Sequence, residues 1–419
     1  MSKPWSTSRF LRFSLLWLFL SALWTALLSI VLPAMADNFS ASGLGWGRGS
    51  LLAVFSAVGA LVSAGTQVVV GWWSDHDASP WRRWRYLLMG FPLTLLPLLL
   101  LSFSGSPLEV LGALVLLQLL ANAGTGPYQA LIPDEVPAER HGVASTWMGV
   151  LEKSGQILGP ILCVALLGEK LQGLLELSFV LYGGLLVGLA ALWSALPVGA
   201  SSVSFERQPS SLLEGLKRTL GSDPRFRLVL QSRLVINVGF YLVVYFLLFF
   251  VQYSLGHRDP AAVTGQMLGC MVCGGIVGGL LIGPRADKGR KLPLIYLTCA
   301  ITGVGMAGFV AMPASSTGLA YVFAGVAGFG FGGFSVVDWS LACNLAPRAS
   351  SALSMGVWNL AAVLPQVIAP GLFGPLSDTM AQQWGAGTSY RIVMLFVILF
   401  LALGCLRLSG LSEDSPKES

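Results

Sequence analysis

Four charged side chains lie within segments that are otherwise apolar, and these residues are the best suited to chemistry. Glu152 and Lys153 stand near the middle of one segment, and Asp338 and Arg233 stand in two others. A charge in an apolar environment is costly, so it indicates either a charged partner or a water-filled cavity. A carboxyl group there can bind and release a proton as its surroundings change. Glu152 is therefore the first candidate for an ion-coupling site, and Asp338 is the second.

Each of these charges also has a structural interpretation. An ion pair would explain Glu152 and Lys153, but adjacent helix positions point about 100° apart and do not face each other. The position of Arg233 near a segment end favours a long side chain that reaches the membrane surface. Asp338 lies near the end of its segment, where a carboxylate can serve a gate instead of a substrate.

Uncharged polar side chains recur at helical spacing beside these charges. Amides can bind hydroxyl groups, and aromatic rings stack on the apolar faces of sugars, so the set suits a polyhydroxylated ligand. The same residue types also hold membrane helices together by hydrogen bonds, so either role is open for any single Gln or Ser. The candidate cavity residues are Gln118, Asn122, Gln129, Gln156, Asn237, Tyr241, Tyr245, Asp338, Trp339, Trp358, Asn359 and Gln366.

The elements that carry these residues are predicted to be membrane-spanning helices. The chain is 54% hydrophobic and 11% charged, whereas a soluble domain averages about 25% charged residues. A polar linker at 199–227, with a short amphipathic helix at 210–220, separates two halves at 1–198 and 228–419. Each half has six stretches of roughly 20 apolar residues, at 11–36, 49–73, 86–103, 108–130, 143–168 and 177–197, then 228–253, 262–283, 291–312, 318–345, 351–375 and 391–409. The predicted fold class is an all-α membrane protein with twelve transmembrane helices.

Charge and motif content exclude other classes. Most of the 25 Lys and Arg residues fall in segments on one side of the membrane, which places both termini in the cytoplasm. This spread over loops gives no indication of a nucleic-acid partner. All six cysteines lie in apolar segments, which argues against a disulfide framework. The three histidines lie in loops, and the sequence has neither a nucleophile–base motif nor a GxxxxGK[ST] loop, which argues against an enzyme or an ATP-driven pump.

The two halves contain the same loop motif. A glycine, a carboxylate four residues later and a group of cations fit a tight cytoplasmic turn, where the carboxylate can cap a helix or pair with an arginine. The glycines and the aspartates are each separated by 212 positions, and further identities such as Gln156 with Gln366 recur at an offset of 210. Duplicated six-helix halves are typical of transporters with a site between the halves. The motif residues are Gly71, Asp75, Arg82 and Arg83, then Gly283, Asp287, Gly289 and Arg290.

With these motifs, the sequence resembles the major facilitator superfamily over nearly its whole length. The loop GPRADKGRK (283–291) matches the superfamily signature between helices eight and nine. The first copy differs by an insertion at 76–81. That spaced form, with PYQALIPDEVP (127–137) and GVASTWMGVLEKSGQILGP (142–160), is similar to the glycoside–pentoside–hexuronide cation symporters and sucrose/proton symporter-like proteins.

The resemblance implies alternating access between two halves related by a pseudo-two-fold axis. The Asp75/Arg83 and Asp287/Arg290 loops would stabilise the outward-facing state from the cytoplasm. We expect proton-coupled uptake of a sugar or glycoside across the plasma membrane by a monomer in the lipid bilayer, with no cofactor or metal. Cation-symporting members of this group often carry acidic residues in their first two helices, and this chain has none there before Asp75, which argues against sodium and favours a proton. Two alternatives stay open, namely a proton-driven exporter of amphipathic compounds and a non-transporting receptor or scaffold.

Overall fold

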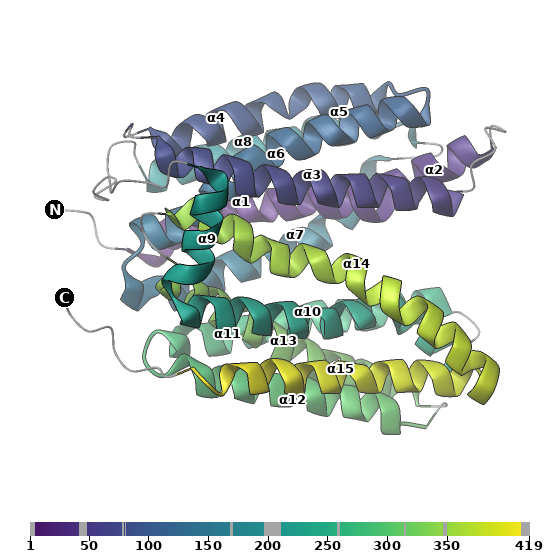
Figure 1. The fold of residues 1–419 in the computed structure, drawn as a ribbon. Coiled ribbons are helices and arrows are strands. Elements are labelled where there is room, and N and C mark those ends of the chain that lie inside the picture. Colours follow the sequence, from purple (N-terminus) through teal and green to yellow (C-terminus); the bar gives the residue numbers. More distant parts are fainter. Residues whose placement is uncertain are drawn as a thin grey trace. The chain divides into compact units, whose positions relative to one another are not determined.

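The structure is a computed structural model that describes residues 5–41, 48–77, 79, 81–167, 171–196, 211–257, 260–313, 316–346 and 350–411, and the regular elements in these residues are helices (Figure 1). The first group of helices is α1 (Thr7–Ala26), α2 (Leu32–Ala41), α3 (Arg48–His76), α4 (Arg82–Leu93), α5 (Leu95–Ser102), α6 (Pro107–Glu135), α7 (His141–Leu166), α8 (Leu174–Ala195) and α9 (Leu212–Ser222). The second group is α10 (Pro224–Phe249), α11 (Pro260–Ala286), α12 (Lys291–Ala311), α13 (Thr317–Leu345), α14 (Ser351–Trp384) and α15 (Ala386–Leu408).

Local sequence explains where several helices begin. The hydroxyl of Ser6 accepts a hydrogen bond from a backbone N–H in the first turn of α1, and Ser106 does the same for α6, where Pro107 follows. Asp223 caps α10 in the same way, before Pro224. Such caps satisfy N–H groups that have no partner inside the helix. The predicted amphipathic helix at 210–220 is present as α9, at Leu212–Ser222.

Eleven helical segments of the described chain are long and apolar enough to cross a membrane. The predicted span at 143–168 is α7, which is not among them. α7 has 26 residues and is therefore about 39 Å long, enough to cross a hydrocarbon core of about 30 Å. It carries Glu152, Lys153 and Gln156, which lower its hydropathy. Together with α7, these segments account for the twelve predicted spans.

The residues divide into two compact units that do not follow chain order. Unit 1 contains 1–138, 150–219 and 346–359, and unit 2 contains 139–149, 220–345 and 360–419. The beginning of α7 therefore belongs to unit 2, and the beginning of α14 belongs to unit 1. The division at 1–198 and 228–419 stays a prediction.

Each unit is held together by helix packing. In unit 1, α6 packs against α3, α4 and α5, while α8 packs against α1 and α5 (Figure 1). In unit 2, α13 packs against α11 and α12, and α15 packs against α10 and α12. The glycine-rich parts of α11 and α13 face each other, because a Cβ atom on Gly332 would meet the backbone of Gly275. Small residues at such interfaces let membrane helices approach closely.

Candidate functional site

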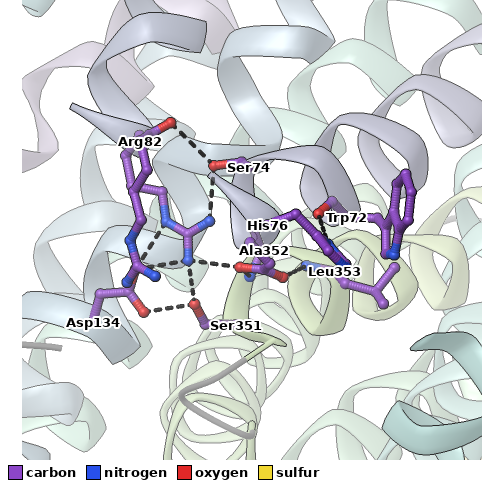
Figure 2. Close-up of polar contacts among 10 residues, drawn as sticks. Trp72, Ser74, His76, Arg82, Asp134, Ser351, Ala352 and Leu353 are labelled. Carbon is purple, nitrogen blue, oxygen red and sulfur yellow. Dashed lines mark hydrogen bonds and ion pairs between the residues drawn. The ribbon is translucent and has the colours of Figure 1, made fainter. Parts of the chain in front are cut away.

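The first loop motif forms a buried charge cluster in unit 1. The Arg83 guanidinium lies 2.8 Å from Oδ1 of Asp75 and 2.9 Å from Oδ2 of Asp134. It also donates to the hydroxyls of Ser74 at 2.8 Å and Ser351 at 2.7 Å. Figure 2 shows how Arg82, Asp134, Ser74 and Ser351 lie around this centre. We call these residues, with Ala352 and Leu353, the Asp75 junction.

Asp75 also caps the beginning of α14. Its two carboxylate oxygens accept hydrogen bonds from the backbone N–H groups of Ala352 at 3.2 Å and Leu353 at 2.8 Å. A carboxylate at a helix N-terminus is stabilised by the unpaired N–H groups and by the helix dipole. Gly71 lets the two helices approach, because a Cβ atom there would lie 2.6 Å from the carbonyl oxygen of Ala352. Asp75 therefore pairs with an arginine and caps a helix at the same time.

The second loop motif makes the equivalent contact in unit 2. Asp287 accepts hydrogen bonds from the N–H groups of Gly142 at 2.5 Å and Val143 at 2.8 Å, at the beginning of α7. Nδ1 of His141 lies 2.6 Å from Oδ1 of Asn344. We call these five residues the Asp287 junction.

The charged groups around Asp287 differ from those around Asp75. Burial raises the pKa of Asp287, while the N–H groups of Gly142 and Val143, together with Lys291 and Arg140, oppose that rise. Arg290 is exposed, and the ion pairs found among the described residues do not join it to Asp287. In the first loop the motif carboxylate therefore both caps a helix and pairs with an arginine, whereas in the second loop it caps a helix. The role of the Asp75/Arg83 and Asp287/Arg290 loops in stabilising the outward-facing state stays a prediction.

The internal repeat also relates junction residues that lie outside the two loop motifs. Ser351 corresponds to His141 at the offset of 210, and Asp134 corresponds to Asn344. In both junctions the two corresponding residues are hydrogen-bonded, since Ser351 donates to Asp134 at 2.5 Å. A comparison of all positions at the offset of 210, and not only of the identical ones, would predict these two pairs from the sequence.

The short helix α9 covers part of the Asp75 junction. Gly215 and Thr219 are buried, and a Cβ atom on Gly215 would contact Leu353 and Trp72. The neighbouring Lys217 and Arg218 are exposed. One face of α9 therefore packs on protein within unit 1, while Lys217 and Arg218 lie on its exposed face.

Glu152 and Lys153 are close to each other despite their adjacent positions. Nζ of Lys153 lies 3.8 Å from Oε1 of Glu152 and 3.3 Å from Oε1 of Gln156. Nε2 of Gln156 lies 3.4 Å from Oε1 of Glu152. The side chains of Glu152 and Lys153 are 34% and 19% exposed. We call these three residues the α7 cluster. The argument that adjacent helix positions cannot meet is wrong here, because both side chains are long enough for the ammonium and the carboxylate to come within 3.8 Å.

Asp338 is bonded to Arg233 in unit 2. The Arg233 guanidinium on α10 donates to Oδ2 of Asp338 on α13, and both side chains are largely buried. The interpretation of Arg233 as a side chain that reaches the membrane surface is therefore wrong, because its guanidinium is bonded to the buried carboxylate of Asp338 on α13. One turn further along α10, the side-chain amide of Asn237 donates to the carbonyl of Ala361 at 3.0 Å.

The predicted amides of α6 form a network with α3. Oδ1 of Asn122 accepts hydrogen bonds from Ser63 at 3.0 Å and Gln67 at 2.6 Å, and its amide donates to Oε1 of Gln118 at 2.7 Å. Asn122 therefore joins two helices, which is the structural role left open by the sequence. Oε1 of Gln67 and Oε1 of Gln129 are buried, and neither has a hydrogen-bond partner among the described residues.

The remaining candidates are spread over α10, α13 and α14. Tyr241 and Tyr245 lie next to each other, with ring centroids 6.1 Å apart, and Tyr245 is 41% exposed. Trp339 and Trp358 are buried, whereas Asn359 and Gln366 are partly exposed. The amide of Gln366 donates to the carbonyl of Ala362 on its own helix at 3.2 Å.

Comparisons with known proteins agree with this fold. A crystal structure of a bacterial homologue of the iron transporter ferroportin, in its outward-facing state, is similar with a TM-score of 0.72 and 14% identity, over 96% of this chain and 97% of that chain. The human organic anion transporter MFSD10 (TETRAN) is similar with a TM-score of 0.67 and 14% identity, over 95% of this chain and 98% of that chain. Identity this low shows the fold alone. No curated protein matched the sequence.

A family model gives the more specific result. The model of the Major Facilitator Superfamily matches residues 14–370. These comparisons do not support the narrower likeness to glycoside–pentoside–hexuronide and sucrose symporters. The match covers most of the chain and includes both loop motifs, so this multi-pass membrane protein belongs to the major facilitator superfamily of transporters.

Proposed function

We propose that this secondary transporter takes up a small hydroxylated molecule, a sugar or glycoside, together with a proton by alternating access. It would work as a monomer in the cytoplasmic membrane, with both termini in the cytoplasm. The observation that carries the proposal is the α7 cluster. It places a partly exposed carboxyl, an ammonium and an amide near the midpoint of a helix that crosses the membrane. Charges at that depth require a water-filled cavity or a partner.

Glu152 is the proposed proton site. Its carboxylate oxygen is close to both Lys153 and Gln156, so protonation changes the contacts of both neighbours. Asp338 is the second candidate, but its bond to Arg233 already satisfies its charge.

Polar groups within each unit support a hydroxylated substrate. Gln67 and Gln129 each keep a buried oxygen without a partner, and such an oxygen can accept a hydrogen bond from a hydroxyl group. Tyr245 adds an exposed ring on α10. The Asp75 and Asp287 junctions would act as gates, because each holds a helix N-terminus by bonds that can break and re-form.

The test is uptake of radiolabelled sucrose and maltose into proteoliposomes, with and without an inward proton gradient. We expect accumulation that depends on the gradient and is lost in Glu152→Gln. Glu176→Gln is the matched control, because it makes the same chemical change at an exposed position at the beginning of α8. Uptake that is unchanged in Glu152→Gln would show that Glu152 does not couple transport. No uptake by the wild type, with gradient-driven efflux instead, would identify an exporter.

A further inference from the structure

Lys153 is held more loosely than three other cations of the membrane helices, Arg83, Arg233 and Arg391. Arg83 lies within 3 Å of two buried carboxylates, and the Arg233 guanidinium is bonded to Asp338. Arg391 donates to the backbone carbonyls of Val310, Met312 and Ser254. Among the residues that the structure describes, the ammonium of Lys153 instead has one hydrogen bond, at 3.3 Å, and a carboxylate at 3.8 Å. An ammonium group has three donors, so Lys153 can bind a further acceptor.

Among the described residues of unit 1, helix α1 packs against α7 and brings no charge to Lys153. Within unit 1, α7 packs against α1, because a Cβ atom on Gly155 would meet Leu18 and Ser21, and one on Gly159 would meet Ala22. In α1 and the residues after it, no titratable side chain occurs between Phe13 and Ala36. The interface between α7 and α1 therefore carries no charge other than those of Glu152 and Lys153 in the α7 cluster.

Charge balance then constrains what the site can bind. With Glu152 ionised and Lys153 protonated, the α7 cluster is neutral. A proton taken up by Glu152 leaves the single positive charge of Lys153 at membrane depth, which is unfavourable in a medium of low dielectric constant. A neutral sugar cannot compensate that charge. An anion can, since its carboxylate would replace Glu152 as the partner of Lys153.

We propose that the substrate is a small organic monoanion, such as a sugar acid, whose carboxylate binds Lys153 while Glu152 carries the co-transported proton. This inference rests on the proton coupling at Glu152 in the proposed function and replaces its neutral sugar by an acidic one, so if it holds, sucrose and maltose do not accumulate. The empty site holds one negative and one positive charge. The loaded site holds a neutral carboxyl, an ammonium and the substrate carboxylate. Both states are neutral, so one proton and one anion cross together without net charge.

The experiment compares D-glucuronate with D-glucose, which differ by the carboxylate at C6, in proteoliposomes of the full chain. A proton gradient and a membrane potential are imposed separately, the latter by a potassium gradient with valinomycin. We expect an inward proton gradient to drive accumulation of glucuronate and not of glucose. A membrane potential alone should drive no accumulation of glucuronate, because the loaded carrier is neutral.

Two substitutions of Lys153 and one control test the assignment. Lys153→Gln should raise the half-saturation concentration of glucuronate at least about tenfold, the effect of losing one charge-assisted hydrogen bond. Lys153→Arg should keep the preference for the anion, because it keeps the charge. Lys217→Gln on α9 makes the same change at an exposed position and should leave uptake as in the wild type. Size-exclusion profiles and unfolding temperatures show whether each variant is folded.

The outcomes separate this inference from the proposed function. Gradient-driven uptake of glucose without uptake of glucuronate would overturn the anion and keep sugar symport. Glucuronate uptake that is equal in the wild type and Lys153→Gln would overturn the role of Lys153. If neither compound is transported, thermal stabilisation by glucuronate, gluconate and lactate decides. Stabilisation that Lys153→Gln lacks would support the anion site, and its absence for all three would overturn it.

Discussion

Replacing Arg83 by Met tests whether the Asp75 junction is held by buried charge. The substitution removes the cation that lies 2.8 Å from Asp75 and 2.9 Å from Asp134, and it also removes donors to Ser74 and Ser351. Arg82 remains, at 3.3 Å from Asp134, so two buried carboxylates would share one cation. Removing one partner of a buried ion pair costs about 3–5 kcal/mol, because the remaining charge is left uncompensated.

Arg85→Ala is the matched control. Arg85 pairs with Asp77 at 2.9 Å, but its side chain is 59% exposed, and exposed pairs contribute about 0–1 kcal/mol. Unfolding in detergent can be followed with a thiol-reactive fluorophore in a background that keeps Cys163 and replaces the other five cysteines by alanine, because Cys163 of unit 1 is buried until the unit opens. We expect Arg83→Met to lower the unfolding temperature far more than Arg85→Ala.

A double substitution sharpens the test. Adding Asp134→Asn to Arg83→Met removes one uncompensated carboxylate, so the double variant should be more stable than Arg83→Met alone. Equal unfolding temperatures for Arg83→Met and Arg85→Ala would refute the reasoning. So would a double variant that is less stable by the sum of both single effects, because the two residues would then act independently.

Two further predictions concern the junctions. Gly71→Ala should destabilise unit 1 by about 1–3 kcal/mol through overpacking, since the new Cβ atom would lie 2.6 Å from the carbonyl oxygen of Ala352. Gly65→Ala on the same helix is the control, because its Cβ atom would meet no atom within 4 Å and should cause no overpacking. Cys163 labelling compares the two variants. Because burial raises the pKa of Asp287 above its ordinary 3.8, its proton contributes stability that is fully present below the ordinary pKa and is lost as the pH rises through the raised pKa. The unfolding temperature of the wild type relative to Asp287→Asn should therefore fall across that window, and a difference that is constant with pH would contradict the prediction.

The sequence predicts the helices well because membrane helices follow length and hydropathy. The hydropathy signal is weakest for α7, which carries the α7 cluster, since polar residues at membrane depth lower the hydropathy of the helix that bears them. The loop motifs also predict the positions of Asp75 and Asp287, because each combines a glycine that permits close approach with a carboxylate suited to a helix N-terminus.

The partners of these residues could not be predicted from local spacing. Asp75 binds backbone N–H groups, which every residue has, so no side-chain type marks Ala352 and Leu353 as its partners. The partner of Arg233 is 105 residues away in the sequence, and only the packing of α10 and α13 brings it near. The roles of the amides depend on which acceptors are already satisfied, as for Asn122 and Gln129, and that is a property of the folded network.

The beginning of α7 belongs to unit 2 and the beginning of α14 belongs to unit 1, and this arrangement has a consequence for biosynthesis. The backbone N–H of Ala352, which binds Asp75, is synthesised 277 residues later. This is a delay of about 14–55 s at a synthesis rate of roughly 5–20 residues per second. Until then, Arg83 and the two carboxylates lack the hydroxyl and N–H groups of 351–353. In the opposite sense, the beginning of α7 emerges 145 residues before its own aspartate, about 7–29 s earlier at the same rate. Unit 1 therefore cannot complete its fold until residues 346–359 have been synthesised. A fragment that ends after the first six helices should expose an unfinished charge cluster to membrane chaperones and proteases.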